Sequence, residues 1–338
     1  MTYPPFALTR LTLSMGVLLL AGCNGNDSSP KPEQPTLGHR TVSLIEQDGL
    51  QFKDLDGSGA LTPYEDWRLG AAERARDLVG RLSLAQKAGL MMHGTLVLDA
   101  DGRVNLTAMD KMLREDGVNT FITRMAGDPA AIADDNNRLQ ALLEGVGLGI
   151  PMTVSTDPRN HFTHDPNATS IGAGAFSQWP ETLGLAAIGD AALVQRFGDI
   201  ARQEYRAVGI HEALSPQADL ATEPRWGRIN GTFGEDNLLA KSLVKAYIEG
   251  FQQGSDGIGP ESVVTVVKHF AGAGPQKDGL DAHNPWGKEQ VYPGGQFAYH
   301  LVPFEGAFEA KVGAVMPYYA LPEGLTHEGQ AIEEVGFG

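Results

Sequence analysis

The sequence predicts an α/β fold, a (β/α)8 TIM-type barrel. Short apolar runs typical of strands alternate with longer amphipathic segments typical of helices, which predicts a parallel sheet covered by helices. The apolar runs lack polar alternation, as in strands that are buried on both faces. Polar residues follow nearly every run, namely Arg124, Asp157, Asp219, Lys268-His269 and Tyr318-Tyr319.

These polar residues decide between the two folds that the alternation allows. In a (β/α)8 barrel, one face collects the polar groups from many strand ends. A doubly wound sheet that binds nucleotides should instead carry a Gly-rich turn after an early strand, and the sequence has none there. We therefore expect the barrel, with its functional site at the carboxyl ends of the strands.

Residues 1–22 have the layout of a lipoprotein signal peptide. Arg10 precedes an apolar stretch over residues 11–20, an order typical of secretory signals, and the stretch is too short to span a bilayer as a stable helix. It closes with Leu20-Ala21-Gly22-Cys23, which resembles the bacterial lipoprotein cleavage box. The resemblance implies cleavage before Cys23 and lipidation of its thiol. The alternative is an ordinary signal peptide followed by a chance cysteine.

The composition of the remaining chain restricts its partners. Residues 23–40 are rich in Asn, Ser, Pro and Gly and predict a flexible tether. We expect an exported, lipid-anchored protein of the periplasm or cell envelope that meets the membrane only through its lipid. Cys23 is the single cysteine, which excludes internal disulfides. A formal net charge of −16 without a basic tract argues against nucleic acid as a partner.

Residues 41–70 predict an EF-hand-like calcium loop with a lead-in helix. Oxygen ligands recur at the spacing of such a loop, at Asp54, Asp56, Ser58, Ala60 (through its carbonyl), Thr62 and Glu65. Gly59 occupies the position of the sharp turn. We expect a structural Ca²⁺ here and no cofactor for catalysis. The alternative is a solvated turn whose carboxylates cap the next helix.

The remaining elements follow from the period of the apolar residues. Apolar side chains recur about every 3.6 residues over residues 65–82, and Ser83 is placed to cap a second helix. The same reasoning predicts helices at residues 65–82, 84–91, 129–148, 190–208, 237–253 and 296–309. Apolar runs with β-branched residues predict strands at residues 118–125, 151–155, 213–215, 262–267 and 313–316.

The residues at the strand ends suit the binding of a neutral sugar. Such a ligand offers many hydroxyls and no charge, and hydrogen bonds from charged groups discriminate hydroxyls better than neutral ones. Asp157 could accept hydrogen bonds from two hydroxyls, while Arg228, Lys268 and His269 could donate to others. The sequence has neither a His/Asp/Glu cluster at zinc spacing nor a Gly-x-Ser-x-Gly motif, which argues against a catalytic metal and a serine hydrolase.

Each of these residues also has a purely structural interpretation. Trp226 and Tyr319 could line the wall of a sugar site, but Trp226 could equally be packed in a core. Arg225 is better explained as the partner of Glu223 or Glu235 than as a substrate contact. The Lys-His pair could lie in a solvated loop.

Residues 71–338 resemble the amino-terminal barrel of glycoside hydrolase family 3. The resemblance is carried by residues 82–89 (Leu-Ser-Leu-Ala-Gln-Lys-Ala-Gly), 176–180 (Phe-Ser-Gln-Trp-Pro), 224–228 (Pro-Arg-Trp-Gly-Arg), 233–236 (Phe-Gly-Glu-Asp), 268–270 (Lys-His-Phe) and 315–316 (Val-Met). These motifs occur in the family's order. By position, the resemblance implies that the sugar-holding residues are Asp157, Arg228, Lys268, His269 and Tyr319.

One departure from the family concerns the catalytic residues. In the family, the nucleophilic Asp follows the Val-Met strand by several tens of residues inside a Ser-Asp motif, and the acid/base usually comes from a later domain. The sequence ends at Phe337-Gly338, before such a motif. The resemblance therefore implies a barrel that is incomplete at its C-terminus and catalytic residues beyond Gly338. It also implies a chain that alone turns over no substrate and binds sugar weakly at most.

For the full-length enzyme, the resemblance implies hydrolysis of terminal β-D-glucosyl residues from β-glucosides or oligosaccharides by a retaining mechanism. Within the family, β-xylosidase and β-N-acetylglucosaminidase are the alternatives. Members of the acetylglucosaminidase subgroup carry a motif that resembles Lys-His-Phe-Pro-Gly-His-Gly, in which the second His is catalytic. Residues 268–274 are Lys-His-Phe-Ala-Gly-Ala-Gly, so this sequence lacks that second His. A non-catalytic sugar-binding surface lipoprotein is the alternative from a different class.

Overall fold

The computed structural model describes residues 32–162 and 171–332. The chain divides into two units, Met1–Thr36 and Leu37–Gly338, and every element below belongs to the second. The predicted signal peptide, the lipidation residue Cys23 and the first part of the predicted tether lie outside the described residues. Across the described ranges, no helix combines the length and the apolar character needed to cross a membrane.

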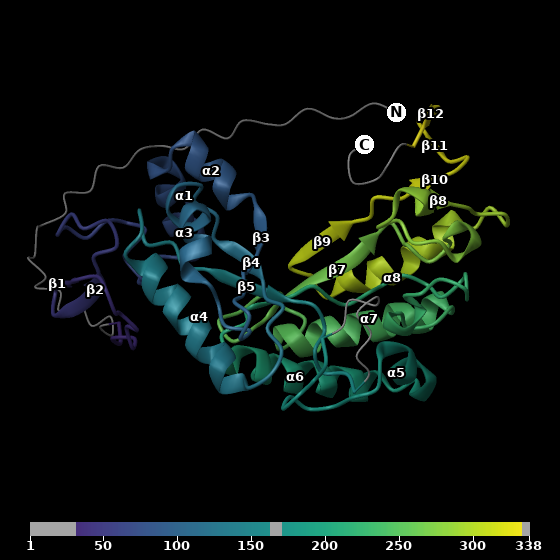
Figure 1. Ribbon diagram of the computed structural model, residues 1–338, viewed down its shortest axis with the longest axis horizontal. Coiled ribbons are helices and arrows are strands. Elements are labelled where there is room, and N and C mark those ends of the chain that lie inside the picture. The colour runs from purple at the N-terminus through teal and green to yellow at the C-terminus, as the bar shows by residue number, and fades with distance from the viewer. Residues whose placement is uncertain (1–31, 163–170, 333–338) are drawn as a thin grey trace, which may run out of the picture. The chain divides into compact units, whose positions relative to one another are not determined.

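The central sheet consists of parallel strands that follow one another in chain order (Figure 1). Its six strands are β3 (His93–Thr95), β4 (Thr120–Ile122), β5 (Thr153–Thr156), β6 (Glu212–Ala213), β7 (Val264–Phe270) and β9 (Ala314–Pro317). Each strand pairs in parallel with the next. A doubly wound sheet reverses its strand order at a switch point, so this unreversed order is that of a barrel. With six strands in the described part of the chain, the prediction of an incomplete (β/α)8 barrel is confirmed.

Helices connect the strands and cover the sheet (Figure 1). They are α1 (Ala71–Arg81), α2 (Leu84–Leu90), α3 (Leu106–Arg114), α4 (Pro129–Glu144), α5 (Thr182–Ile188), α6 (Ala191–Ala207), α7 (Asn237–Gln252) and α8 (Phe297–Glu309). Ser83 caps α2 in a reciprocal capping box with Gln86, as its sequence predicts. Asp190 and Asp236 accept hydrogen bonds from the first backbone N–H groups of α6 and α7. These caps explain why the predicted starts of the helices agree with the structure.

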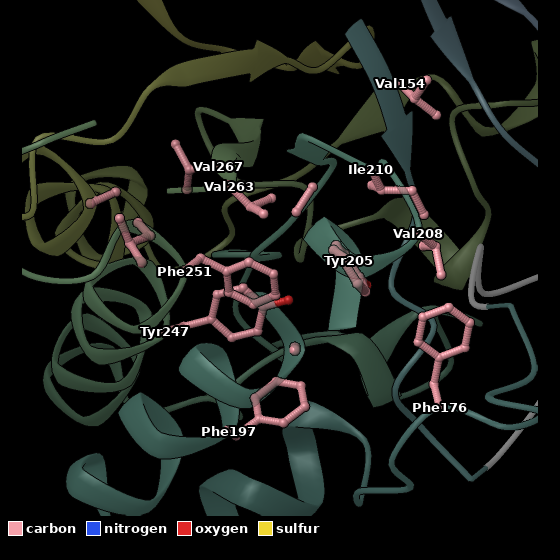
Figure 2. Close-up of a cluster of buried hydrophobic side chains, with 14 of the residues drawn as sticks. Val154, Phe176, Phe197, Tyr205, Val208, Ile210, Tyr247, Phe251, Val263 and Val267 are labelled. Atoms are coloured by element: carbon pink, nitrogen blue, oxygen red, sulfur yellow. The ribbon is translucent and has the colours of Figure 1, made fainter. Parts of the chain in front are cut away.

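The largest hydrophobic cluster joins the sheet to α6 and α7 (Figure 2). Tyr247 and Phe251 of α7 stack inside it, with ring centroids 4.8 Å apart. The two helices approach closely where Gly198 faces Gly250, because a Cβ on Gly250 would lie 2.3 Å from the backbone oxygen of Gln195. The contact between these helices therefore depends on glycine at both positions.

The segment ahead of the predicted calcium loop corrects one expectation. It is an antiparallel hairpin of β1 (Leu44–Gln47) and β2 (Leu50–Lys53), not a lead-in helix. Asp48 and Gly49 form its turn with positive φ angles of 56° and 75°, and an Asp-Gly pair between short apolar runs is a strong hairpin signal. Phe52 then lies fully buried and stacks on Trp67. The Asp-Gly turn therefore favours a hairpin over the predicted helix.

Other differences are local. The helix expected at residues 65–82 begins only at Ala71, since residues 65–70 form turns ahead of it. The prediction did not include β3, α3 and α5. Strand β3 has no apolar run, and its Gly94 lies against the ring of Phe121, where a Cβ would come within 2.7 Å. The remaining short elements are η1 (Ile229–Gly231), η2 (Lys277–Gly279), η3 (Pro285–Gly287), β8 (Glu289–Gln290), β10 (Leu321–Pro322), β11 (Thr326–His327) and β12 (Gln330–Ala331).

Candidate active site

A buried ion pair links two of the predicted sugar-binding residues. Asp157 directly follows β5, Lys268 lies in β7, and both side chains are about nineteen-twentieths buried, at 5% exposure each. The Lys268 Nζ lies 3.0 Å from Oδ1 of Asp157, and Arg124, which follows β4, donates from Nη1 to Oδ2 at 2.6 Å. Burial opposes ionisation of Asp157, but Lys268 and Arg124 outweigh it and hold the pKa of the carboxyl below its ordinary value. The carboxylate is therefore an anion that can accept hydrogen bonds.

A chain of hydrogen bonds joins the other two predicted cationic residues. Asp219, fully buried after β6, accepts from the backbone N–H of His269 at 3.1 Å and lies 2.7 Å from Nδ1 of its ring. Its Oδ1 also accepts from the backbone N–H of Ala273 at 2.6 Å. On the far side of the ring, Nε2 of His269 lies 3.3 Å from Nη2 of Arg228. Asp219 thus holds the ring that faces Arg228.

The protonation state of His269 follows from its surroundings. Burial lowers the pKa of its imidazole to about 4, although Asp219 works in the opposite direction, so the ring is neutral at neutral pH. A neutral ring carries one proton, and the carboxylate at Nδ1 keeps it there. Nε2 is then an acceptor that receives an N–H of Arg228. His269 in this state orients Arg228 through Nε2, whereas its sequence position predicts a donor to the sugar.

The two predicted aromatic wall residues differ in burial: Trp226 is buried and Tyr319 is half-buried. Trp226 is 1% exposed and its Nε1 donates to Asp281 at 2.8 Å, so it is packed in a core and does not form an open platform. Tyr319 is half-buried and stacks on Tyr318 with centroids 5.1 Å apart. Tyr318 in turn contacts the ring of His269, at 5.1 Å between centroids. Tyr319 therefore lies one ring away from the polar cluster.

The structure joins four of the five predicted sugar-binding residues in two pairs, Asp157 with Lys268 and Arg228 with His269. Arg124 and Asp219 complete these pairs, and the prediction of site residues omitted both. The available signal was their position, because each lies in the segment after a strand of the sheet, Arg124 two residues beyond β4 and Asp219 six residues beyond β6. The predicted pairing of Arg225 with Glu223 is present, with Nη2 of Arg225 2.9 Å from Oε2 of Glu223.

The acidic loop brings together part of its predicted ligand set. Asp54, Asp56 and Glu65 each offer a carboxylate oxygen, and these oxygens lie within 4.8 Å of one another. Glu65 Oε1 also accepts from the backbone N–H of Leu55 at 2.7 Å, and the Thr62 hydroxyl donates to its Oε2 at 2.5 Å. Three carboxylates at this separation fit the oxygen ligation of Ca²⁺. The other predicted ligands, Ser58, Ala60 and Thr62, lie on the same loop but are not part of this carboxylate group. The calcium site therefore stays a prediction.

Comparison with known proteins supplies the context of these residues. The family described as Glycosyl hydrolase family 3 N terminal domain matches residues 98–326. A protein of Dickeya chrysanthemi named periplasmic beta-glucosidase/beta-xylosidase is 53% identical over 312 residues, which are 90% of this chain and 48% of that protein. Beta-glucosidase C of Emericella nidulans is 45% identical over 275 residues, 80% of this chain and 44% of that protein.

A solved structure has the same fold. It is that of a glycoside hydrolase family 3 beta-N-acetylglucosaminidase from Paenibacillus sp. str. FPU-7, with a TM-score of 0.58 and 26% sequence identity over 74% of this chain and 44% of that one. The chain spans about half the length of the curated relatives that it matches.

Proposed function

The chain belongs to glycoside hydrolase family 3, and from this premise we propose that its protein hydrolyses terminal β-D-glucosyl residues from β-glucosides or oligosaccharides. The names of the two relatives at 53% and 45% identity support this reaction. The observation that carries the proposal is the buried Asp157–Lys268 ion pair, which lies where strand ends of a barrel gather functional groups. The name of the Dickeya protein also supports export to the periplasm.

Within this proposal, the charged cluster binds the non-reducing sugar. Asp157 accepts from sugar hydroxyls, while Lys268 and Arg228 donate to them, and Tyr319 covers an edge of the site. A hydrogen bond to a charged group contributes about 1.5–3 kcal/mol, so a few such bonds account for selection of one sugar. His269 and Asp219 keep Arg228 in place, and Arg124 keeps Asp157 ionised.

Catalysis with retention needs a carboxylate nucleophile and a second carboxyl that first donates a proton. Asp157 and Asp219 are each engaged by neighbouring donors and have pKa values below the ordinary range. Burial opposes this lowering in both, and the adjacent Lys268 or His269 outweighs it. Neither is a proton donor at neutral pH. We therefore assign them to binding and orientation, and we assign the two catalytic roles to other carboxyls of the whole protein.

The sugar is the open part of the proposal. The printed name of the Dickeya relative includes beta-xylosidase, so xylosides are the second candidate substrate. For β-N-acetylglucosaminides the support is weaker. By resemblance, the catalytic His of that subgroup falls at the position of Ala273. Initial rates of the whole protein with nitrophenyl β-glucoside, β-xyloside and N-acetyl-β-glucosaminide rank the three, and we expect the glucoside to be fastest.

Sugar binding by the 338-residue chain tests the site itself. Isothermal titration calorimetry with methyl β-D-glucoside should show binding that Lys268→Met weakens by at least about tenfold, the loss expected when one charged hydrogen bond is removed. Lys245→Met removes a partly exposed lysine of α7, which is paired with Glu309, and should leave binding unchanged. Equal affinity of Lys268→Met and the unmodified chain would refute the assigned role. Binding without turnover by the whole protein would instead favour a sugar-binding lipoprotein.

A further inference from the structure

A cavity outside the charged cluster has the features of a second ligand site. It has a volume of about 450 Å³ and lies among the segments that follow β6 and β7 and the start of α8. Small-molecule sites in proteins measure about 300–1,000 Å³. The strands are parallel, so their carboxyl ends lie at the end of the barrel that carries Asp157 and Lys268, and the cavity lies at this end.

The walls of the cavity are largely apolar and contain several side-chain rings. Tyr292, Pro293 and Tyr299 contribute to them, together with Pro275. The ring of Tyr292 lies edge-on to that of His300, with centroids 5.5 Å apart and an angle of 80°. Such surfaces pack against the C–H faces of a flat or puckered ring.

Three buried polar atoms at the wall have no hydrogen-bond partner within the described part of the chain. They are Nε2 and Oε1 of Gln276 and Nδ1 of His300. Gln276 is 1% exposed and His300 is 4% exposed, and both residues line the cavity. Buried polar groups are nearly always paired in folded proteins. An amide with both ends unpaired beside a cavity of this size indicates a ligand that brings a donor and an acceptor.

The charge of the surroundings restricts the ligand further. Burial lowers the pKa of His300 to about 4, so its ring is neutral at neutral pH. Glu223 is the one carboxylate among the residues that line the cavity, and Arg225 is hydrogen-bonded to it. The walls therefore carry no unbalanced charge that would select an ion, and neutral hydroxyls are the groups that satisfy an amide and an imidazole together.

We propose that this cavity is a second binding site for a neutral sugar, with Gln276 and His300 as its polar contacts. The choice of a sugar rests on the proposed function. The segment after β7 connects the two sites, because Asp219 accepts from the backbone N–H of Ala273 and Pro275 and Gln276, which follow closely, line the cavity. A free monosaccharide such as glucose has the right chemistry for this position.

The test separates the two sites by variants of the 338-residue chain. Calorimetric titration with methyl β-D-glucoside is carried out on Lys268→Met, which disables the charged cluster. Residual binding is expected, and adding Gln276→Leu should weaken it by at least about tenfold. His300→Gln serves as a second variant, Gln203→Leu as a surface control on α6, and sorbitol as an acyclic control ligand.

The outcomes of this test distinguish binding in the cavity from binding at the charged cluster. No residual binding in Lys268→Met, or residual binding that Gln276→Leu and His300→Gln leave unchanged, overturns the second site while the proposed function stands. Binding that Lys268→Met leaves intact and Gln276→Leu removes refutes the charged cluster and supports the cavity. The melting temperature of Gln276→Leu should not fall, because an unpaired buried amide stabilises nothing. A marked fall indicates that Gln276 has a structural partner, which also overturns the proposal.

Discussion

Asp219 is fully buried and acts on the candidate site through the ring of His269. Its carboxylate fixes the proton of His269 on Nδ1, and Nε2 is thereby left to receive Arg228. Asp219 and Arg228, both from the segment between β6 and α7, are aligned in this way with His269 of β7. We regard Asp219 as a positioning residue, since it acts on Arg228 through the imidazole.

Asp219→Asn should reverse the tautomer of His269. The amide N–H₂ group would face Nδ1, the proton would move to Nε2, and Nε2–H would then confront the Nη2 donor of Arg228. We expect methyl β-D-glucoside affinity to fall about ten- to hundredfold, the worth of one to two hydrogen bonds to a charged group.

Nitrogen NMR of the histidine rings checks this directly, because protonated and unprotonated ring nitrogens resonate far apart. A merely structural role of Asp219 would lower stability without exchanging the two signals of His269. Asp278→Asn is the matched control, since Asp278 is exposed and 3.7 Å from its nearest cation, Arg225.

From the sequence, most residues of the polar cluster could be predicted to lie together, but their individual contacts could not. Asp157 and Lys268 could be predicted because strand ends of a barrel meet at one face. The acceptor role of His269 could not, because it depends on the carboxylate of Asp219, fifty residues earlier in the chain. Arg124 was visible as a strand-end residue, but its contact with Asp157 exists only in three dimensions.

At the scale of the elements, the contact between α6 and α7 depends on glycine. Gly250→Ala would place a methyl group 2.3 Å from the Gln195 carbonyl oxygen and 2.9 Å from Cα of Gly198. Backbone atoms cannot yield as a side chain does, so we expect the free energy of unfolding to fall by about 1–3 kcal/mol or more. Gly80→Ala in α1 is the control, because its methyl group would meet nothing within 4 Å. That change should stabilise by about 0.4–1 kcal/mol, and urea titrations of both variants measure the contrast.

The acidic loop is the element whose ligand remains to be tested. We propose that it holds a structural Ca²⁺ through Asp54, Asp56 and Glu65. An ion that binds only the folded state stabilises it by about 2.7 kcal/mol at one hundred times its dissociation constant. A chelator should therefore lower the melting temperature, and Asp56→Asn should abolish most of that response. Asp101→Asn, in an exposed turn, is the control; a melting temperature indifferent to chelator and calcium would count against the ion.

Element prediction failed where the pattern was short. The helices α6 and α7 carry long apolar stripes and acidic caps, and their predicted limits agree with the structure to within a residue or two. Strand β3 has three residues, one of them glycine, and gives no periodic signal. It is a strand because the pairing with β4 and the room that Gly94 leaves for Phe121 favour it, and both are tertiary effects.

For the molecule as a whole, the sheet has two edges in the described part of the chain. Strand β3 pairs only with β4 and strand β9 only with β7. Exposed apolar residues lie close in sequence to these edges, Met91 at 86%, Met92 at 59% and Val315 at 40%. Uncovered edges and apolar patches promote association, so the purified 338-residue chain should self-associate with rising concentration. Light scattering coupled to gel filtration measures this, and a monomer at all concentrations would contradict it.

The carboxylate of Glu144 connects the segment around the hairpin to α4. Glu144, the last residue of α4, accepts from the backbone N–H groups of Arg40 and Thr41 at 2.6 and 2.7 Å, and Lys53 of β2 donates to its other oxygen at 2.8 Å. Burial opposes ionisation of this carboxyl, but Lys53 and the two N–H groups outweigh it and lower its pKa to about 2. The ordinary value is 4.5, so the anion is stabilised by folding.

This shift fixes the pH range in which the contact contributes. Because the pKa is lower in the folded state, the stabilisation is complete above about pH 4.5 and is lost as the pH falls toward 2. Its size is about 3 kcal/mol, at 1.36 kcal/mol per pKa unit. Glu144→Gln should therefore reduce the free energy of unfolding by about that amount at neutral pH and by progressively less between pH 4.5 and 2. Urea titrations across this range, with Glu115→Gln at the exposed end of α3 as control, measure the difference. A Glu144→Gln deficit that does not shrink on acidification would show that packing around the side chain, and not its charge, holds the hairpin to α4.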